Sequence, residues 1–284
     1  MGYTQVELDK KKYNRGLSPV GEVPLTVIEA ANRLSAFEHL KADIIAIRPY
    51  VRPELADAFF AAIEYPVLAA AAMNTKILDS VNSHRAYEEI QALTQRYNEM
   101  NGGKWRYLMD AAPRELPVFG DVHARLLPIP ADAPTRSLSR SLSTSTQFPI
   151  PIIHNACDYA EASQGTRKIQ MLGHSMNAVA LQRDGWLSYR FVVDTEGDYI
   201  LQTALIPTQP NDNGDLRYSV GLDSGEPVVF NLKEPFRSEG WKQNVLRGQA
   251  LREQKVHLSA GQHTLTIRAL DAHIVVDQWH LEVR

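Results

Sequence analysis

The sequence has almost no cysteine and no excess of charge of either sign. Cys157 is its single cysteine, so the chain can form no internal disulfide and offers no pair of thiolates for a metal. Its 30 Lys and Arg residues are balanced by 33 Asp and Glu residues, which gives a formal net charge of -3. Proteins that bind nucleic acids gather positive charge to contact phosphates, so this balance argues against a nucleic-acid partner.

Long uninterrupted hydrophobic runs are missing as well. The most apolar stretch, residues 56–72, contains Asp57, Glu64 and Pro66, whereas a membrane-spanning helix needs about 20 predominantly apolar residues. The N-terminus lacks the succession of basic, apolar and cleavable segments that marks a signal peptide. We therefore expect neither a membrane span nor an export signal, and the sequence leaves the compartment open.

What the sequence does contain is typical of a soluble globular protein with two domains. Its 284 residues are 44% hydrophobic and 22% charged, and single domains usually have about 100–200 residues. In residues 27–47, apolar side chains recur at steps of three and four, which predicts a helix.

Two further helices are predicted after this one. The second begins at Pro53 and continues through a kink at Pro66; the third begins with Ser83 as its N-cap and stops at Asn101-Gly102-Gly103. A short fourth helix over residues 104–109 completes the pattern. Because the connections are short, we assign residues 1–112 to an antiparallel helical bundle.

Residues 113–151 have a different composition and predict a linker. This stretch contains seven prolines and a serine-rich segment at residues 137–143, which favours a semi-rigid strap between two domains. Part of it could dock back on the bundle through Leu116, Val118 and Phe119.

Beyond Pro151 the hydrophobic period becomes two, which indicates half-buried strands. We expect strands at residues 187–193, 199–205, 218–222, 227–232, 255–258, 263–270 and 274–283, with a helix over residues 241–246 as an interruption. Many short antiparallel strands at this spacing favour a β-sandwich of jelly-roll type over residues 152–284. The predicted fold class is therefore α+β in two domains, a helical bundle followed by an antiparallel β-sandwich.

Several short runs are more specific than these patterns. They are LRYSVGLDSGEP at residues 216–227, WKQNVL at 241–246, GQHTLTI at 261–267 and IVVD at 274–277. In order and spacing they resemble the C-terminal domain of glycoside hydrolase family 115. In the helical half, residues 57–60, 65–67, 69–74, 93–98 and 102–105 are similar to the bundle that follows the catalytic barrel of that family.

The resemblance implies the C-terminal half of a xylan α-1,2-glucuronidase, an enzyme that removes glucuronic or 4-O-methylglucuronic acid side chains from xylan. The family carries its catalytic carboxylates on an upstream (β/α)8 barrel, so we expect no activity from this chain alone. That barrel, in cis in the parent protein or in trans, is the implied partner. Xylan or glucuronoxylan and a second copy of the chain, as a homodimer, are further candidate partners, and the family suggests a periplasmic or extracellular location.

The acidic residues of the helical half show no catalytic arrangement. Glycoside hydrolysis normally requires two carboxylates on either side of the scissile bond. Glu88 and Glu89 are adjacent on a predicted helix and point in different directions, while Glu54, Asp57 and Glu64 fit an ordinary solvated face. We therefore expect no catalytic residue in this chain.

Metal ligands and cofactor motifs are not indicated either. The nine histidines lack metal-binding spacing, although four of them could approach one another across a sheet: His257, His263, His273 and His280. The run Asp212-Asn213-Gly214-Asp215 fits a polar turn better than a calcium loop. We expect no metal and no cofactor.

Aromatic residues of the sandwich offer a possible sugar-binding platform. The candidates are Trp241, Trp186 and Tyr218, because exposed aromatic faces can stack on sugar rings; burial in the core is the alternative. Trp279 alternates with polar neighbours in a predicted strand, which favours a core position, whereas Trp241 follows Gly240 in a loop-like stretch, which favours exposure.

Three functional hypotheses follow. The chain is the accessory half of an α-glucuronidase, a carbohydrate-binding adaptor, or an inert remnant of a truncated gene. The third predicts a large exposed apolar patch where a barrel would otherwise pack.

Overall fold

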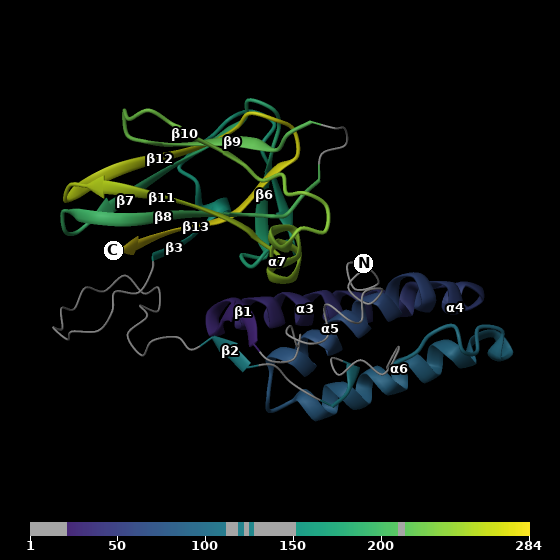
Figure 1. The fold of residues 1–284 in the computed structure, drawn as a ribbon. Helices are drawn as coiled ribbons and strands as arrows, with labels where there is room; N and C mark the ends of the chain where they lie inside the picture. Colours follow the sequence, from purple (N-terminus) through teal and green to yellow (C-terminus); the bar gives the residue numbers. More distant parts are fainter. Residues whose placement is uncertain (1–21, 112–118, 122–124, 128–151, 210–213) are drawn as a thin grey trace. The chain divides into compact units, whose positions relative to one another are not determined.

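The computed structural model describes residues 22–111, 119–121, 125–127, 152–209 and 214–284. The chain divides into two compact units, residues 1–129 and 130–284 (Figure 1). The first unit is helical and the second contains two antiparallel sheets. This confirms the predicted α+β fold class.

The described residues of the helical unit form three long helical segments that follow the predicted periodicity. They are α3 (Val27–Ile47), a continuous run of α4 (Ala56–Phe59), a π-helical turn (Phe60–Glu64) and α5 (Tyr65–Leu78), and then α6 (Ser83–Gly103), with short 3-10 turns at Arg48–Tyr50 and Pro53–Leu55. Thr26 caps α3 by accepting a hydrogen bond from Glu29 N at 3.2 Å, while the Glu29 carboxylate accepts from Thr26 N at 2.8 Å. As predicted, the second helical segment continues through Pro66, directly after the π-helical turn.

Helix α5 packs against α3 on one side and α6 on the other (Figure 1). One apolar cluster joins α5 to α6, with Phe60, Leu68, Leu93 and Met100 buried and Tyr65 and Tyr97 packed against them. A second, smaller cluster joins the start of α3 to the end of α5 through Leu25, Ala30 and Leu78. The core of this unit is therefore built around one central helix.

Two details of α6 differ from the prediction. The N-cap is Asn82, because the Asp79 carboxylate accepts hydrogen bonds from the N–H groups of Val81 and Asn82 and so forms the turn one residue earlier. The Ser83 hydroxyl instead donates to Lys76 O at 2.8 Å.

The predicted fourth helix, residues 104–109, is wrong. The segment forms turns, because the Asn98 side chain bonds both Met109 N and Met109 O, at 3.1 and 2.9 Å, and Tyr107 adopts φ of 67°. The predicted stop is confirmed, since Asn101, Gly102 and Gly103 all have positive φ.

Most of the predicted linker lies outside the described residues, including Leu116 and Val118. Its described parts contact the helical unit. Gly120 O accepts a hydrogen bond from Lys76 Nζ at 2.7 Å, and strand β2 (Arg125–Leu127) pairs in parallel with β1 (Glu22–Thr26). The start of the linker region therefore docks back on the first unit.

The second unit is a sandwich of two antiparallel sheets (Figure 1). One sheet has the order β10 (Val228–Asn231), β9 (Arg217–Leu222), β12 (Gly261–Ala269), β7 (Trp186–Val193), β4 (Glu161–Ala162). The other has the order β11 (Ala250–Leu258), β8 (Gly197–Leu205), β13 (Ile274–Val283), β6 (Asn177–Leu181), β5 (Arg167–Gln170), with β3 (Ile152–Asn155) also paired to β13. Helix α7 (Glu239–Arg247) lies between β10 and β11 in the chain.

The two sheets share one hydrophobic core. Leu265 and Ile267 of β12 belong to the same buried cluster as Val276 and Trp279 of β13. In β12 the alternation of Leu265 and Ile267 with polar residues is the period-two pattern that predicted the strand.

His263 links two turns of the sandwich as a charged side chain. Its Nδ1 lies 2.8 Å from Asp223 Oδ2 and its Nε2 lies 2.9 Å from Ser259 O. Both partners are acceptors, so both ring nitrogens must donate, which requires the imidazolium form. The hydrogen bond to Asp223, followed by the bond to Ser259, raises the pKa of His263.

This arrangement predicts a pH-dependent stability. Because the folded pKa lies above the unfolded value, the stabilisation from His263 is complete below about pH 6.5 and is lost as the pH rises through the raised pKa. We expect the free energy of unfolding to fall over that range, and to fall less in His263→Gln than in the unchanged protein. Denaturant titrations at a series of pH values measure this, with His39→Gln, at an exposed histidine of the helical unit, as the control. Equal pH slopes in His263→Gln and the unchanged protein would contradict it.

Candidate functional site

The aromatic residues predicted to bind sugar do not form one platform. Tyr218 is fully buried; its hydroxyl lies 2.6 Å from Thr203 Oγ1, and burial raises its pKa well above the usual range. Trp186, at the start of β7, and Trp241, in α7, are each half-buried. Trp279 is fully buried, as its alternation predicted. Tyr218 therefore presents no ring face to a ligand, and sugar binding by Trp241 and Trp186 stays a prediction.

An exposed aromatic ring that the sequence reasoning missed lies beside Trp241. Phe236, in the loop between β10 and α7, is 66% exposed. Its ring meets the Trp241 ring edge to face, with centroids 5.3 Å apart, and the Arg237 guanidinium lies 5.3 Å from the Phe236 centroid. The available signal was a phenylalanine among turn-forming residues, EPFRSEGW, directly before a predicted helix. We call Phe236, Arg237 and Trp241 the aromatic loop site.

Local hydrogen bonds fix this loop. Ser238 N donates to Pro235 O at 2.9 Å, and Ser238 Oγ accepts from Trp241 N at 3.1 Å, which makes Ser238 the N-cap of α7. Glu234 pairs with Arg252 at 2.8 Å. Gly240 lies so close to Glu234 that a Cβ there would approach its Oε2 to 2.8 Å. The site therefore sits on a rigid loop.

The far end of α7 is anchored to β13 through buried Asp277. Its carboxylate accepts hydrogen bonds from His174 N, Ser175 N, Ser175 Oγ and Gln249 Nε2, at 2.8, 3.1, 2.6 and 2.7 Å. The His174 ring in turn lies 2.8 Å from Arg247 O at the end of α7. This network ties the helix to the six-stranded sheet.

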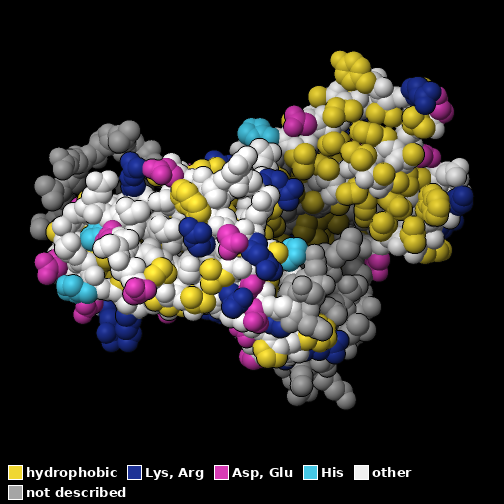
Figure 2. Space-filling model, turned by 90° about the horizontal axis from the view of Figure 1, so that it is seen from above, with side chains coloured by type: hydrophobic (Ala, Val, Ile, Leu, Met, Phe, Trp, Pro, Cys, Tyr) yellow, Lys and Arg dark blue, Asp and Glu magenta, His cyan; other side chains and the backbone are white. Residues whose placement is uncertain are grey.

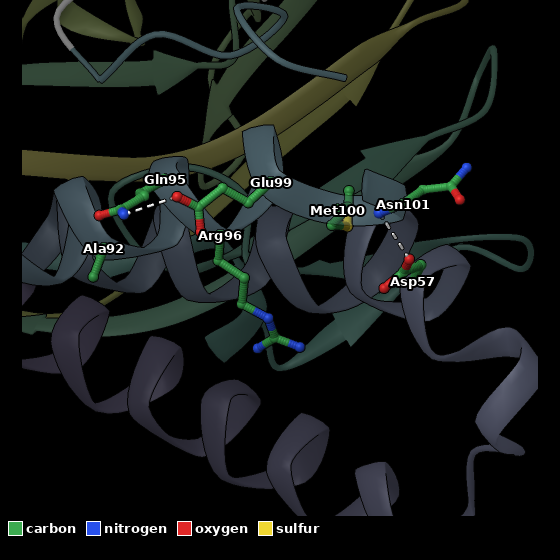
Figure 3. Close-up of a pocket in the computed structure, with 7 residues that line it drawn as sticks. All are labelled: Asp57, Ala92, Gln95, Arg96, Glu99, Met100 and Asn101. Atoms are coloured by element: carbon green, nitrogen blue, oxygen red, sulfur yellow. Dashed lines mark hydrogen bonds between the residues drawn. The ribbon is translucent and has the colours of Figure 1, made fainter. Parts of the chain in front are cut away.

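The helical unit has a hollow of about 420 Å³ between α4 and α6, lined by Asp57, Ala92, Gln95, Arg96, Glu99, Met100 and Asn101 (Figure 3). Its polar groups bind one another. Asp57 accepts from Asn101 N at 3.2 Å and Gln95 donates to Glu99 at 2.9 Å. Arg96 lies 3.7 Å from the Phe60 ring centroid and 3.6 Å from Glu64. The polar groups of the hollow are therefore already engaged within the helical unit, which indicates a structural role for them and not a ligand site.

The acidic residues that the sequence singled out are also engaged. Glu54 and Asp57 are exposed as predicted, but the solvated position predicted for Glu64 is wrong, because it is buried in the π-helical turn and pairs with Arg48 and Arg96. Glu89 pairs with Lys41 at 2.9 Å. Among the described residues, no three His, Cys, Asp or Glu side chains come together in a way that could hold a metal ion. The run at 212–215 lies partly outside the described residues.

One surface of the helical unit is strongly apolar. Of the 21 residues of α3, only Ala30 and Ile44 are buried. Figure 2 shows hydrophobic side chains gathered over this unit with few charges among them. We call the exposed large hydrophobic residues of this part the apolar surface: Val27, Ile28, Ile45, Ile47, Tyr50, Leu55 and Ile63.

One helical run of the unit, Pro53–Leu78, is long and apolar enough to span a membrane by length and composition alone, although none was predicted. Only 28% of its most apolar window is buried. The exposed part of this run lies mainly before α5, at residues 53–58, whereas within α5 only Pro66 is exposed.

Comparisons with known proteins agree with the fold. Residues 158–284 match the model of the glycosyl hydrolase family 115 C-terminal domain. A solved family 115 4-O-methyl-α-glucuronidase, BtGH115A, with specificity for decorated arabinogalactans, is 31% identical over 92% of this chain, with a TM-score of 0.68. The match covers 34% of that protein, so this chain spans about a third of its length. A search of curated proteins found no match.

Two carbohydrate-binding modules also match part of the chain. One is the C-terminal family 6 module of a laminarinase from Zobellia galactanivorans, 17% identical over 47% of this chain and 99% of its own, with a TM-score of 0.36. The other is a family 35 module from Clostridium thermocellum, 13% identical over 46% of this chain and 98% of its own, with a TM-score of 0.38. Scores this low establish nothing about function. The match of residues 158–284 and the likeness to BtGH115A over both units identify the chain as the helical bundle and C-terminal domain of a glycoside hydrolase family 115 protein.

Proposed function

We propose that this chain is the accessory, non-catalytic C-terminal part of a family 115 α-glucuronidase, and that it supports a catalytic barrel. The apolar surface of the helical unit carries this proposal. Monomeric soluble proteins rarely expose contiguous apolar areas larger than a few hundred Å², and larger ones mark interaction sites. Ile45 and Ile63 are each 44% exposed, although isoleucine side chains are normally buried.

A protein partner fits this surface better than a lipid bilayer. Glu64 and Lys76 are buried in the unit, and both are held by polar partners from other segments, Arg48 and Gly120 O. These contacts place the run Pro53–Leu78 inside a folded domain and leave one side free. BtGH115A extends far beyond the region that this chain matches, so a family 115 protein has additional mass available to cover that side. The catalytic barrel of the family is therefore the partner that we assign to the apolar surface.

The substrate of the whole enzyme would be a polysaccharide with glucuronic or 4-O-methylglucuronic acid side chains. The family resemblance implies xylan, while BtGH115A is specific for decorated arabinogalactans. BtGH115A is itself a 4-O-methyl-α-glucuronidase, so an acidic side group is the feature that the two substrates would share, and the barrel would carry out its removal.

The test is association with a separately expressed family 115 barrel. Size-exclusion chromatography with light scattering should show a complex of one barrel and one chain. The barrel's own C-terminal part, added in trans, serves as the positive control. If that control associates and this chain does not, the proposal fails; self-association of the chain alone would favour a homodimer, and vesicle binding would favour a membrane surface.

A carbohydrate-binding adaptor is the second candidate, and the aromatic loop site favours it. Phe236 keeps 66% of its surface in water on a rigid loop beside Trp241. Aromatic rings at such positions commonly contact ligands.

A further inference from the structure

We infer that the aromatic loop site binds a saccharide that carries a carboxylate, with Phe236 and Trp241 against the sugar ring and Arg237 paired with the acid group. The inference rests on the second candidate function. It adds Phe236 and Arg237 to the sugar-binding candidates that the sequence indicated, and it assigns the acid group of the ligand to one side chain.

The exposed ring is the first observation. Among the described residues of the sandwich, Phe236 is the only aromatic side chain in the group of exposed large hydrophobics. A phenylalanine that merely fills space turns toward the core, because burying such a side chain is worth roughly 1.5–3 kcal/mol. Here the ring stands out from the loop with Trp241 against it at 66°. Two rings at this angle form a corner that can hold an apolar sugar face.

The second observation is the uncompensated charge beside the ring. Within the described part of the chain, no carboxylate pairs with Arg237, although its guanidinium lies over the Phe236 ring. The two nearest acidic residues of this segment already have partners. Glu234 pairs with Arg252 at 2.8 Å, and Glu239 accepts from Gln243 at 2.8 Å and lies 3.6 Å from Lys242.

An arginine with no acidic partner suits a carboxylate ligand. The planar guanidinium can donate two parallel hydrogen bonds to a carboxylate, and these are among the strongest polar contacts in proteins. A neutral sugar could contact the rings of Phe236 and Trp241 but would leave the Arg237 guanidinium without an acidic partner. The geometry therefore favours an acidic sugar, such as a uronic acid, over a neutral one.

The third observation is preorganisation. Arg237 adopts φ of 62°, a left-handed conformation that non-glycine residues rarely take and that is retained where surrounding contacts impose it. The bond from Ser238 N to Pro235 O and the N-cap at Ser238 hold the residues on either side. A loop that is already ordered loses little conformational entropy on binding.

The test is a titration of the full chain, followed by Trp fluorescence and calorimetry. The probes are a glucuronic-acid-substituted xylo-oligosaccharide and the unsubstituted oligosaccharide of the same backbone length. We expect the acidic probe to bind roughly tenfold more tightly, the effect of one charged hydrogen-bonded pair, and its affinity to fall as salt is added. Arg237→Ala should remove the difference between the probes, and Phe236→Ala should weaken both by about tenfold.

Matched controls come from exposed residues elsewhere. Tyr107→Ala removes a ring that is 89% exposed in the helical unit, and Arg167→Ala removes an exposed arginine on β5; neither should change binding. Equal affinity for the two probes would overturn the inference, and the chain would then be a carbohydrate-binding adaptor for neutral sugars. If neither probe binds at millimolar concentration, both the inference and the hypothesis of a carbohydrate-binding adaptor are overturned. Binding that Trp186→Ala abolishes and Phe236→Ala leaves intact would place the site elsewhere and overturn the inference.

Discussion

Replacing Asp277 by alanine is expected to lower the free energy of unfolding of the sandwich by about 3–5 kcal/mol, because several buried donors lose their acceptor together. The carboxylate is fully buried and accepts hydrogen bonds from His174 N, from Ser175 N and Oγ, and from Gln249 Nε2. After the change, these groups face a cavity that offers no equivalent acceptor. The loop between β5 and β6 and the end of α7 should loosen together.

Denaturant unfolding measures this effect, and Asp194→Ala is the matched control. Asp194 is exposed directly after β7, a strand of the other sheet, so its replacement should change stability by less than about 0.5 kcal/mol. Similar effects of Asp277→Ala and Asp194→Ala would contradict the account of the network.

The same network explains Gly173. This residue has φ of 81°, and a Cβ on it would lie 2.2 Å from Asp277 Oδ1. Gly173→Ala should therefore be destabilising by itself and less so in the Asp277→Ala background, where the clash is absent.

A glutamate on the apolar surface is expected to weaken association with the barrel by at least about 100-fold, because an unpaired charge would be buried against apolar atoms. Ile45→Glu on α3 and Ile63→Glu in the π-helical turn test two separate parts of the surface, each at a residue that is 44% exposed in the chain itself. Since both side chains already reach water, the isolated chain should remain folded. Binding is measured by calorimetry, and folding by circular dichroism.

Val81→Glu is the matched control for this pair. Val81 is an apolar residue of the same unit, 89% exposed in the turn before α6 and outside the apolar surface. It receives the same charge without touching the proposed interface, so its affinity should stay within about threefold of the unchanged chain. If all three variants bind alike, the apolar surface is not the docking site.

Much of this architecture could be predicted because its residues repeat with the period of the element that they form. Strands β7 and β12 alternate, and one face of each lies in the shared core, whereas β13 is buried along most of its length. Strands β3 to β6 were not predicted. They are two to five residues long, and β5, with the sequence RKIQ, is an exposed edge strand whose composition carries no alternation. β5 forms a strand because it pairs with β6, and not because of a pattern in its own sequence.

The errors in the helical unit also have local causes. Residues 104–109 contain good helix formers, yet the Asn98 amide closes them into a turn from a position that no short-range pattern reveals. The α3 periodicity predicted a helix correctly but could not show how little of it would be buried within its own unit. The burial of a helix depends on which other segments pack against it, and the local sequence pattern does not contain that information.

The candidate site was predictable in part. The position of Trp241 after a glycine indicated a surface location, and the structure adds Phe236 and Arg237 on the same loop. Tyr218 shows the opposite case. It alternates with the apolar Val220 and Leu222, and the structure places it on the buried face, between its pairing partners Phe230 and Ala269.

Release of glucuronic acid from glucuronoxylan is the measurement that tests the central claim most directly. It compares this chain alone, a separately expressed family 115 barrel alone, and the two mixed, with the barrel's own C-terminal part as the positive control. The account predicts no release by the chain alone and greater release by the mixture than by the barrel alone. Release by the chain alone, or a mixture no more active than the barrel while the control restores activity, would contradict it.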